Sequence, residues 1–314
     1  MKSCRLKNIV LLGVLSISLS MCSSGYQESD FVKQVIKEFT VADSLLDGNN
    51  EELDVIVFSG QSNATGIGRM NYLEKKISEE EYQVYENGFS NVLTNFYVDN
   101  GRNKSDEFTT VKLGQGIKQY YFGPELELAK QLNDDSSRRH VIVKYSYSGT
   151  YLYGQWYDRD QNHVGPLYTA LINFTKTSLD YLIKKNYKPN LKALCWMQGE
   201  YDGLDSNYAD KYDENLTEFV SNFRNDLKGY AQKDIHFIDG AILNDPSQWP
   251  YYKEVNDNKI KYSNTSDLNH YIDTNAYGLH TNEEPSDKPD LAHYDCLSYL
   301  KLGELFADEV KKIH

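Results

Sequence analysis

Short apolar runs, separated by longer segments with helical spacing, constrain the fold of this chain most. Four runs are continuous enough for strands that are buried on both faces, and they cover residues 53–60, 140–149, 191–199 and 234–243. A shorter fifth run covers 268–274. Helical periodicity appears between and after these runs, at residues 123–132, 166–185, 207–230 and 294–313. Apolar strands that alternate with helices predict an α/β fold, with a doubly wound parallel sheet in three α/β/α layers.

The segment between the first run and the helix at 123–132 is long, charged and rich in Tyr and Asn. We expect two further strands within it, at residues 91–99 and 107–114. No internal repeat and no low-complexity linker interrupts the chain after residue 53. The sequence therefore predicts one domain over residues 53–314.

The N-terminus has the pattern of an export signal. A basic start is followed by an apolar stretch at residues 9–19 and then by small residues. This pattern predicts a signal peptide over residues 1–21. The residues up to Cys22 resemble a bacterial lipobox, in which the cysteine is lipidated and becomes the new N-terminus. We expect an exported protein, anchored to a bacterial membrane in the periplasm or at the cell surface, with plain cleavage and secretion as the alternative. Residues 23–50 are polar and predict a tether followed by a short helix.

The composition excludes some partners. The net charge of −13 argues against binding to a nucleic-acid backbone. Beyond the lipid anchor, no contact with a membrane is expected. No Cys or His cluster has the spacing of a zinc site and no glycine-rich phosphate loop is present, so neither a metal nor another cofactor is expected. Cys195 and Cys296 form either a disulfide in an oxidising compartment or two buried free thiols, and we favour the thiols.

Polar residues at the strand ends mark the place to search for chemistry, because ligands of such sheets bind outside the carboxyl ends of the strands. Ser62 offers a hydroxyl there, Gly149 a backbone N–H and Gln198 a side-chain amide. Near the C-terminus, "DLAHYD" offers Asp290 and His293. An ester hydrolase needs these types of group: a nucleophile, a base, an orienting carboxylate and N–H donors for the oxyanion.

Each of these signals is weak alone. The Asp-x-x-His spacing occurs three times, ending at His163, His270 and His293, so spacing does not choose among them. Ser62 also lies outside the G-x-S-x-G elbow of α/β-hydrolases, because Ala64 stands where the second Gly is needed.

The combination of motifs is more specific than its parts. The motifs, in chain order, are "GQSN" at 60–63, "FGPELELA" at 122–129, "KYSYSGT" at 144–150 followed by Trp156, "WMQGEYD" at 196–202 and "DLAHYD…LG" at 290–303. Together they resemble the carbohydrate acetylesterases of carbohydrate esterase family six, the sialate O-acetylesterase-like branch of the SGNH hydrolases. The resemblance covers residues 53–310. It implies a flavodoxin-like three-layer fold and the removal of acetyl groups from acetylated oligosaccharides or polysaccharides, without a cofactor or a metal.

The resemblance also implies catalytic roles. Ser62 would be the nucleophile, His293 the general base, and Asp290 the carboxylate that orients it. The backbone N–H groups of Ser62 and Gly149 and the side chain of Gln198 would form the oxyanion hole.

Further residues would support the site or bind substrate. Gln61 and Asn63 would pin the turn that carries the nucleophile, and Glu200 would fix neighbouring loops through hydrogen bonds. The expected substrate contacts are Trp156, Tyr201 and His163.

The chain departs from the family pattern at two places beside the site. Ser148 precedes Gly149 where the family commonly has Gly, and Tyr201 replaces the small residue that is usual after the glutamate. These departures leave the particular sugar and the position of its acetyl group open.

Two rival interpretations stay open. A carbohydrate-binding protein that has lost activity would lack a member of the triad, and none is missing here. An SGNH lipase or thioesterase would need an apolar acyl channel, whereas these loops are rich in Tyr, Asn and Asp.

Overall fold

A central sheet organises the computed structural model, which describes residues 26–134, 137–158, 163–282 and 285–313. Its eight strands run in the order β12-β11-β10-β1-β7-β3-β4, with β5 also paired to β3. The ladders from β12 to β3 are parallel, and β4 and β5 are antiparallel to β3. The strands are β1 (Glu52–Gly60), β3 (Phe89–Val98), β4 (Asn103–Lys104), β5 (Thr109–Val111), β7 (Arg139–Ser146), β10 (Lys188–Met197), β11 (His236–Gly240) and β12 (Asn269–Ile272).

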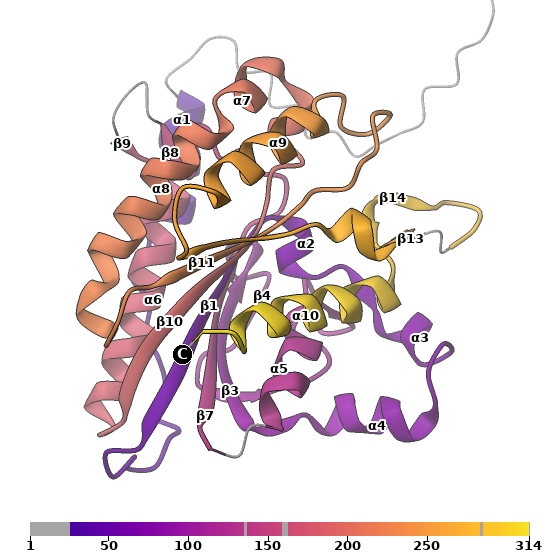
Figure 1. Cartoon of the computed structure of the whole chain (residues 1–314). Coiled ribbons are helices and arrows are strands. Elements are labelled where there is room, and N and C mark those ends of the chain that lie inside the picture. The colour runs from indigo at the N-terminus through magenta and orange to yellow at the C-terminus, as the bar shows by residue number, and fades with distance from the viewer. Residues whose placement is uncertain (1–25, 135–136, 159–162, 283–284, 314) are drawn as a thin grey trace, which may run out of the picture.

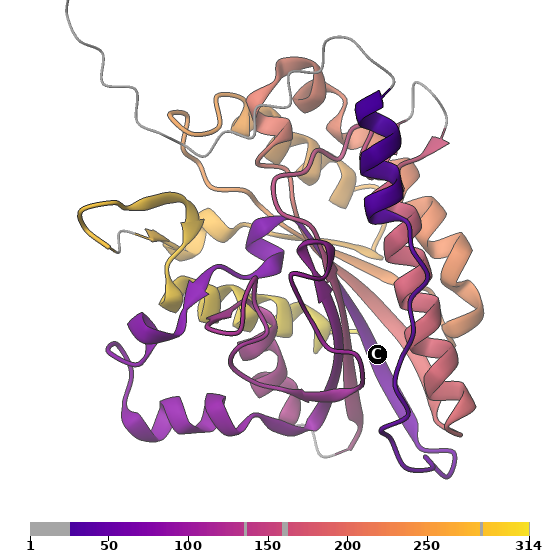
Figure 2. The same cartoon turned by 180° about the vertical axis from the view of Figure 1, so that it is seen from behind.

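Helices cover both faces of this sheet (Figures 1 and 2). The alternation of side chains along β1 explains the two layers, since Val55 and Val57 join a core with α6 and α8, whereas Ile56 and Phe58 join a core with α5 and α10. The predicted α/β/α arrangement is therefore confirmed. The helices are α1 (Tyr26–Val35), α2 (Ser62–Thr65), α3 (Met70–Leu73), α4 (Glu79–Asn87), α5 (Glu125–Asn133), α6 (Pro166–Lys184), α7 (Ser206–Asp210), α8 (Tyr212–Leu227), α9 (Tyr252–Ser263) and α10 (Cys296–Val310).

Among the described residues, three two-stranded ladders lie outside the main sheet. They are β2 (Gly68–Arg69) with β6 (Tyr121–Phe122), β8 (Tyr157–Asp158) with β9 (His163–Val164), and β13 (Thr281–Asn282) with β14 (Asp290–Tyr294).

Some sequence-based expectations need correction. The single helix expected at 207–230 is two helices, α7 and α8, which meet at Lys211. Helices α4 and α9 were not predicted, because few apolar residues mark them: Tyr85 is the buried residue of α4, and α9 buries two polar side chains beside Val255 and Tyr262.

In the described part of the segment before β1, the short helix precedes the extended chain. Helix α1 comes first and buries Val35, and the chain after it runs along α6. The backbone N–H groups of Ser44 and Leu45 both donate to the hydroxyl of Tyr181 on α6, at 3.0 Å. The signal peptide and Cys22 lie outside the described residues. Within the described part of the chain, no helix combines the length and the apolar character needed to cross a membrane.

The two cysteines of the domain do not form a disulfide. Cys195 on β10 and Cys296 at the start of α10 are both buried. Burial raises the pKa of the Cys195 thiol, so this side chain behaves as an inert part of the core.

The register of the sheet aligns the ends of three central strands. Gly60 of β1 lies opposite Ser146 of β7 on one side and Met197 of β10 on the other. Gly60 has a φ of 137°, and a Cβ there would lie 2.0 Å from the carbonyl oxygen of Met197, so only glycine fits. The residues that follow these strands therefore gather at one edge of the sheet.

Candidate active site

Ser62 is the first residue of the single-turn helix α2, and Gln61 separates it from the end of β1. The N–H groups of Ala64 and Thr65 donate to the carbonyl of Gln61, and the N–H of Gly66 donates to Ser62. Because the first N–H groups of a helix have no intrahelical acceptor, the N–H of Ser62 is not used by this turn. The side chain of Ser62 lies among buried residues, with 7% of the residue exposed.

Asp290 and His293 form a close pair on β14. The Nδ1 atom of His293 lies 2.9 Å and 2.8 Å from the two carboxylate oxygens of Asp290. Burial raises the pKa of Asp290, but the hydrogen bond and the charge of His293 outweigh it and hold that pKa below its usual value. Since Nδ1 faces the carboxylate, Nε2 is the ring nitrogen left for another partner.

Asn63 joins the element that carries Ser62 to the element that carries His293. Its Oδ1 accepts hydrogen bonds from the hydroxyl of Tyr299 at 2.8 Å and from the N–H of Tyr294 at 3.4 Å. Asn63 directly follows Ser62, and Tyr294 directly follows His293. The bond therefore brings α2 and β14 together, although 231 residues separate the two partners.

Glu200 continues the hydrogen-bond network of Asn63. Its Oε1 accepts a 2.6 Å hydrogen bond from the side-chain amide of Asn63, which links the loop after β10 to α2. Burial raises the pKa of Glu200, against the hydrogen bond from Asn63 and the charges of Lys259 and His293. Its Oε2 is buried and has no hydrogen-bond partner among the described residues.

Two carboxylates that the sequence analysis missed, the half-buried Asp99 and the buried Asp202, hold the loop around Gly149. Asp99, at the end of β3, accepts a 2.7 Å hydrogen bond from the N–H of Ser148. Asp202 accepts hydrogen bonds from the N–H groups of Leu152 at 2.9 Å and Tyr153 at 3.3 Å. Between these anchors, Gly149 adopts a φ of 67°.

Both missed residues left a trace in the sequence. Asp99 closes the predicted strand at 91–99, and Asp202 closes the "WMQGEYD" motif. Burial raises the pKa of Asp202 to about 6, against the hydrogen bonds from Gln198 and the loop N–H groups.

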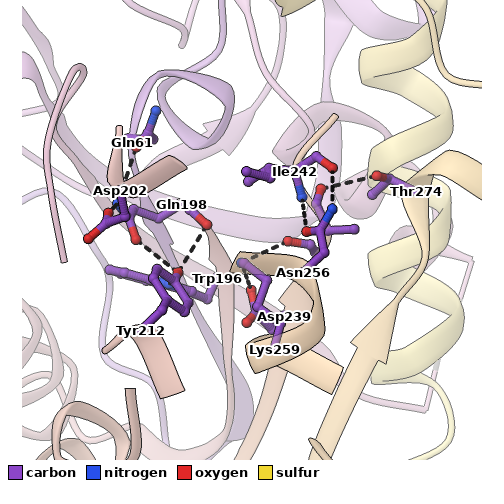
Figure 3. A network of polar contacts seen from close by, with 12 residues as sticks. Gln61, Trp196, Gln198, Asp202, Tyr212, Asp239, Ile242, Asn256, Lys259 and Thr274 are labelled. Carbon is purple, nitrogen blue, oxygen red and sulfur yellow. Dashed lines mark hydrogen bonds and ion pairs between the residues drawn. The ribbon is translucent and has the colours of Figure 1, made fainter. Parts of the chain in front are cut away.

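Gln198 occupies a different position from the one expected for an oxyanion donor. Its side chain is fully buried, and its amide nitrogen donates to Thr150 O at 2.8 Å and Asp202 Oδ2 at 2.6 Å. Gln61 Oε1 lies 3.2 Å from the same nitrogen, and the Tyr212 hydroxyl donates to the amide oxygen at 2.9 Å (Figure 3). A primary amide has two hydrogens, and protein acceptors engage both. The prediction that the Gln198 side chain donates to the oxyanion is therefore wrong for this geometry. Gln198 instead supports the loop that contains Gly149.

Trp156 also departs from its expected role. It is fully buried, packs edge-to-face against Trp196 with ring centroids 5.0 Å apart, and donates its Nε1–H to the Thr150 hydroxyl at 3.1 Å. Trp156 is a core residue and offers no face to a sugar. Tyr201, in contrast, is half-buried beside Gly149.

The other two Asp-x-x-His pairs lie elsewhere or outside the description. His270 on β12 faces Glu309 at 3.3 Å and His236 at 2.9 Å, and His236 begins β11, so this pair lies at the opposite end of the sheet. The backbone of His163 belongs to β9, but its side chain and Asp160 lie outside what the structure describes. In the described ranges, no group of three or more His, Cys, Asp or Glu side chains is placed to hold a metal ion.

Comparison with known proteins gives the family. Residues 52–312 match the family described as "Carbohydrate esterase, sialic acid-specific acetylesterase", so this chain belongs to that family of carboxylic ester hydrolases. A relative from Escherichia coli (strain K12), named "Probable 9-O-acetyl-N-acetylneuraminic acid deacetylase", is 34% identical over 89 residues. That match covers 28% of this chain and 26% of the relative.

Solved structures agree on the fold. A protein from Arabidopsis thaliana superposes with a TM-score of 0.59 at 21% identity, over 82% of this chain and 98% of its own. NanS gives a TM-score of 0.60 at 16% identity, over 84% and 98%. A carbohydrate acetylesterase from Xanthomonas citri gives 0.57 at 14% identity, over 83% and 56%. These likenesses show that the chain shares the α/β fold of these three proteins.

Proposed function

We propose that this chain hydrolyses O-acetyl esters of carbohydrates by a Ser-His-Asp mechanism. The observation that carries the proposal is the Asp290–His293 pair, held beside the Ser62 turn through Asn63. Membership of the carbohydrate esterase family supports the same reaction class. The relative from Escherichia coli supports an acetylated sialic acid as one candidate substrate.

In the acylation step, Ser62 Oγ attacks the carbonyl carbon of the acetyl group. His293 Nε2 accepts the proton of the hydroxyl, and Asp290 stabilises the resulting imidazolium. The tetrahedral intermediate then expels the sugar oxygen, which takes the proton back from His293 and leaves as an alcohol. The product on the enzyme is acetyl-Ser62.

In the deacylation step, water attacks the acetyl carbonyl while His293 accepts its proton. Collapse of the second tetrahedral intermediate returns that proton to Ser62 Oγ and releases acetate. In both steps the backbone N–H groups of Ser62 and Gly149 donate to the oxyanion. Asp99 and Asp202 act as positioning residues, because they hold the two sides of the loop that presents Gly149.

We propose that the protein is exported and lipid-anchored through Cys22. The support is the sequence of residues 1–25, with its basic start, apolar stretch and lipobox-like end. Metabolic labelling with a radioactive fatty acid should label the wild-type chain and not Cys22→Ser. A chain that is exported without a label is secreted instead.

Acetate release tests the reaction. The chain without its signal peptide should hydrolyse 4-nitrophenyl acetate and acetylated sialic acid, xylan or other glycans, and it should act much more slowly on an octanoyl ester. Ser62→Ala should remove most of the activity, by several orders of magnitude. Equal turnover of the octanoyl ester favours the lipase alternative, and no turnover by the folded wild type favours an inactive binding protein.

The base is tested by comparing histidines that share the same spacing to an aspartate. His293→Ala should lower the acylation rate nearly as much as Ser62→Ala, and Asp290→Asn should lower it less. His270→Ala is the matched control, because His270 also has a carboxylate partner but lies at the other end of the sheet. If His270→Ala abolishes turnover in a folded protein while His293→Ala spares it, the assignment of the base is wrong.

A further inference from the structure

Four tyrosines gather beside the candidate active site. Tyr151 and Tyr153 come from the loop after β7, and Tyr201 and Tyr208 come from the loop after β10 and from α7. Tyr153 and Tyr208 stack with ring centroids 4.9 Å apart and planes at 18°. Tyr151 lies edge-on to Tyr208 at 4.9 Å and to Tyr201 at 5.4 Å. We call these four residues the tyrosine cluster, and all four are half-buried.

The tyrosine cluster begins at Gly149. A Cβ built on Gly149 would lie 3.2 Å from both Cζ and Oη of Tyr201, so the tip of this ring borders the proposed oxyanion donor. Tyr201 contacts Tyr151, Tyr151 contacts Tyr208, and Tyr208 contacts Tyr153. The rings therefore form a continuous series that starts beside the proposed oxyanion donor.

The loop that carries two of the rings is held in place. The Asp202 carboxylate accepts the N–H groups of Leu152 and Tyr153, and Gln155 Oε1 accepts the N–H of Tyr151 at 2.8 Å. Lys211 Nζ lies 5.8 Å from the centre of the Tyr153 ring. Because these contacts hold the loop backbone and the rings pack against one another, binding against the rings loses little conformational entropy.

The chemistry of the tyrosine cluster fits a sugar. A pyranose presents C–H groups on its faces and hydroxyls around its edge, and a tyrosine combines an apolar ring with a hydroxyl that donates and accepts. The buried Trp156 is unavailable for this role, as described above.

We propose that the tyrosine cluster is a second sugar subsite, which holds the ring next to the acetylated one. This inference rests on the proposed function and extends it: the preferred substrate is an acetylated sugar within an oligosaccharide rather than the free acetylated monosaccharide.

The test compares two substrates that carry the same ester. We choose 9-O-acetylated sialyllactose with free 9-O-acetyl-N-acetylneuraminic acid, O-acetylated xylotriose with O-acetylated xylose, and O-acetylated chitotriose with O-acetylated N-acetylglucosamine. In the series that is hydrolysed fastest, the wild type should have a trisaccharide kcat/KM about tenfold above that of the monosaccharide. Tyr208→Ala and Tyr153→Ala should each lower this ratio about three- to tenfold, mainly through KM for the trisaccharide.

Controls separate the subsite from general damage. Tyr208→Leu keeps bulk without an aromatic ring and should lower the ratio as Tyr208→Ala does, which covers a folding failure of the alanine variant. Tyr230→Ala removes a tyrosine after the far end of α8, where its hydroxyl donates to Asp180, and should leave the ratio unchanged.

The outcomes of the two proposals are distinct. The subsite is overturned if the ratio of trisaccharide to monosaccharide kcat/KM stays the same in the folded tyrosine-cluster variants. It is also overturned if the enzyme turns over 4-nitrophenyl acetate but none of the trisaccharides. Wild-type turnover of 4-nitrophenyl acetate that Ser62→Ala does not reduce overturns the proposed function instead.

Discussion

Asn63→Ala tests the link between the nucleophile turn and the base more sharply than any surface change. The substitution removes the donor to Glu200 Oε1 and the acceptor of the Tyr299 hydroxyl, at sites that are 0–1% exposed. Each buried polar group that loses its partner costs roughly 1–3 kcal/mol. We therefore expect the free energy of unfolding to fall by about 4 kcal/mol.

The pH dependence of this loss follows from Glu200. Its pKa in the folded chain is raised above the ordinary value of 4.5, so its ionised form opposes folding increasingly as the pH rises above that value. Asn63→Ala removes a hydrogen bond that favours the ionised form. The loss of stability should accordingly be larger at pH 8 than at pH 5.

Urea unfolding at the two pH values provides the assay, with kcat for 4-nitrophenyl acetate as a second readout. We expect kcat to fall about 100-fold, because Ser62 and His293 lose the contact that sets their spacing. Asn207→Ala is the control, since this exposed side chain makes a 3.2 Å hydrogen bond to Asp205, two residues away, and stability should change by less than about 0.5 kcal/mol. A folded Asn63→Ala that loses less than about 1 kcal/mol at both pH values would refute the reasoning.

Two further changes probe the interior around the site. Lys259→Met leaves Asp239 buried without its ion-pair partner, so the free energy of unfolding should fall by about 3–5 kcal/mol. Because burial already raises the pKa of Asp239 to about 6, this loss of stability should be larger at pH 8 than at pH 5. Lys253→Met on the same helix breaks an exposed pair with Asp257 and should have little effect in the same denaturation experiment. Trp156→Ala should cost about 3–5 kcal/mol by thermal or urea unfolding, because the ring is fully buried. A stable Trp156→Ala that loses only affinity for glycans would restore the sugar-stacking role that we reject.

Much of the sheet follows from local sequence patterns. Continuous apolar runs such as 53–60 and 191–199 are long enough to identify β1 and β10, and the parallel arrangement follows from the helices between them. The ladder of β13 and β14 had no such signal, because β14 is polar and half-exposed along most of its length. No strand was therefore predicted at Asp290–Tyr294, although the helix that follows was predicted at 294–313.

The candidate site shows where sequence reasoning stops. Ser62, Gly149 and Gln198 follow three strands whose ends lie in register, so their gathering at one edge was predictable. Which of two side chains in a loop turns inward is decided by tertiary packing. Trp156 fills the core between Trp196 and Tyr145, whereas Tyr151 and Tyr153 stay half-buried. The role of Gln198 likewise depends on Asp202 and Tyr212, which occupy its amide.

The most direct test of the central claim is to trap the acyl-enzyme. Quenching the reaction with an aryl acetate in acid, followed by peptide mapping by mass spectrometry, should locate an acetyl group on Ser62. Asp290→Asn should still form the adduct, more slowly, and Ser62→Ala should form none. An acetyl group on another residue, or steady turnover by a folded Ser62→Ala protein, would contradict the account.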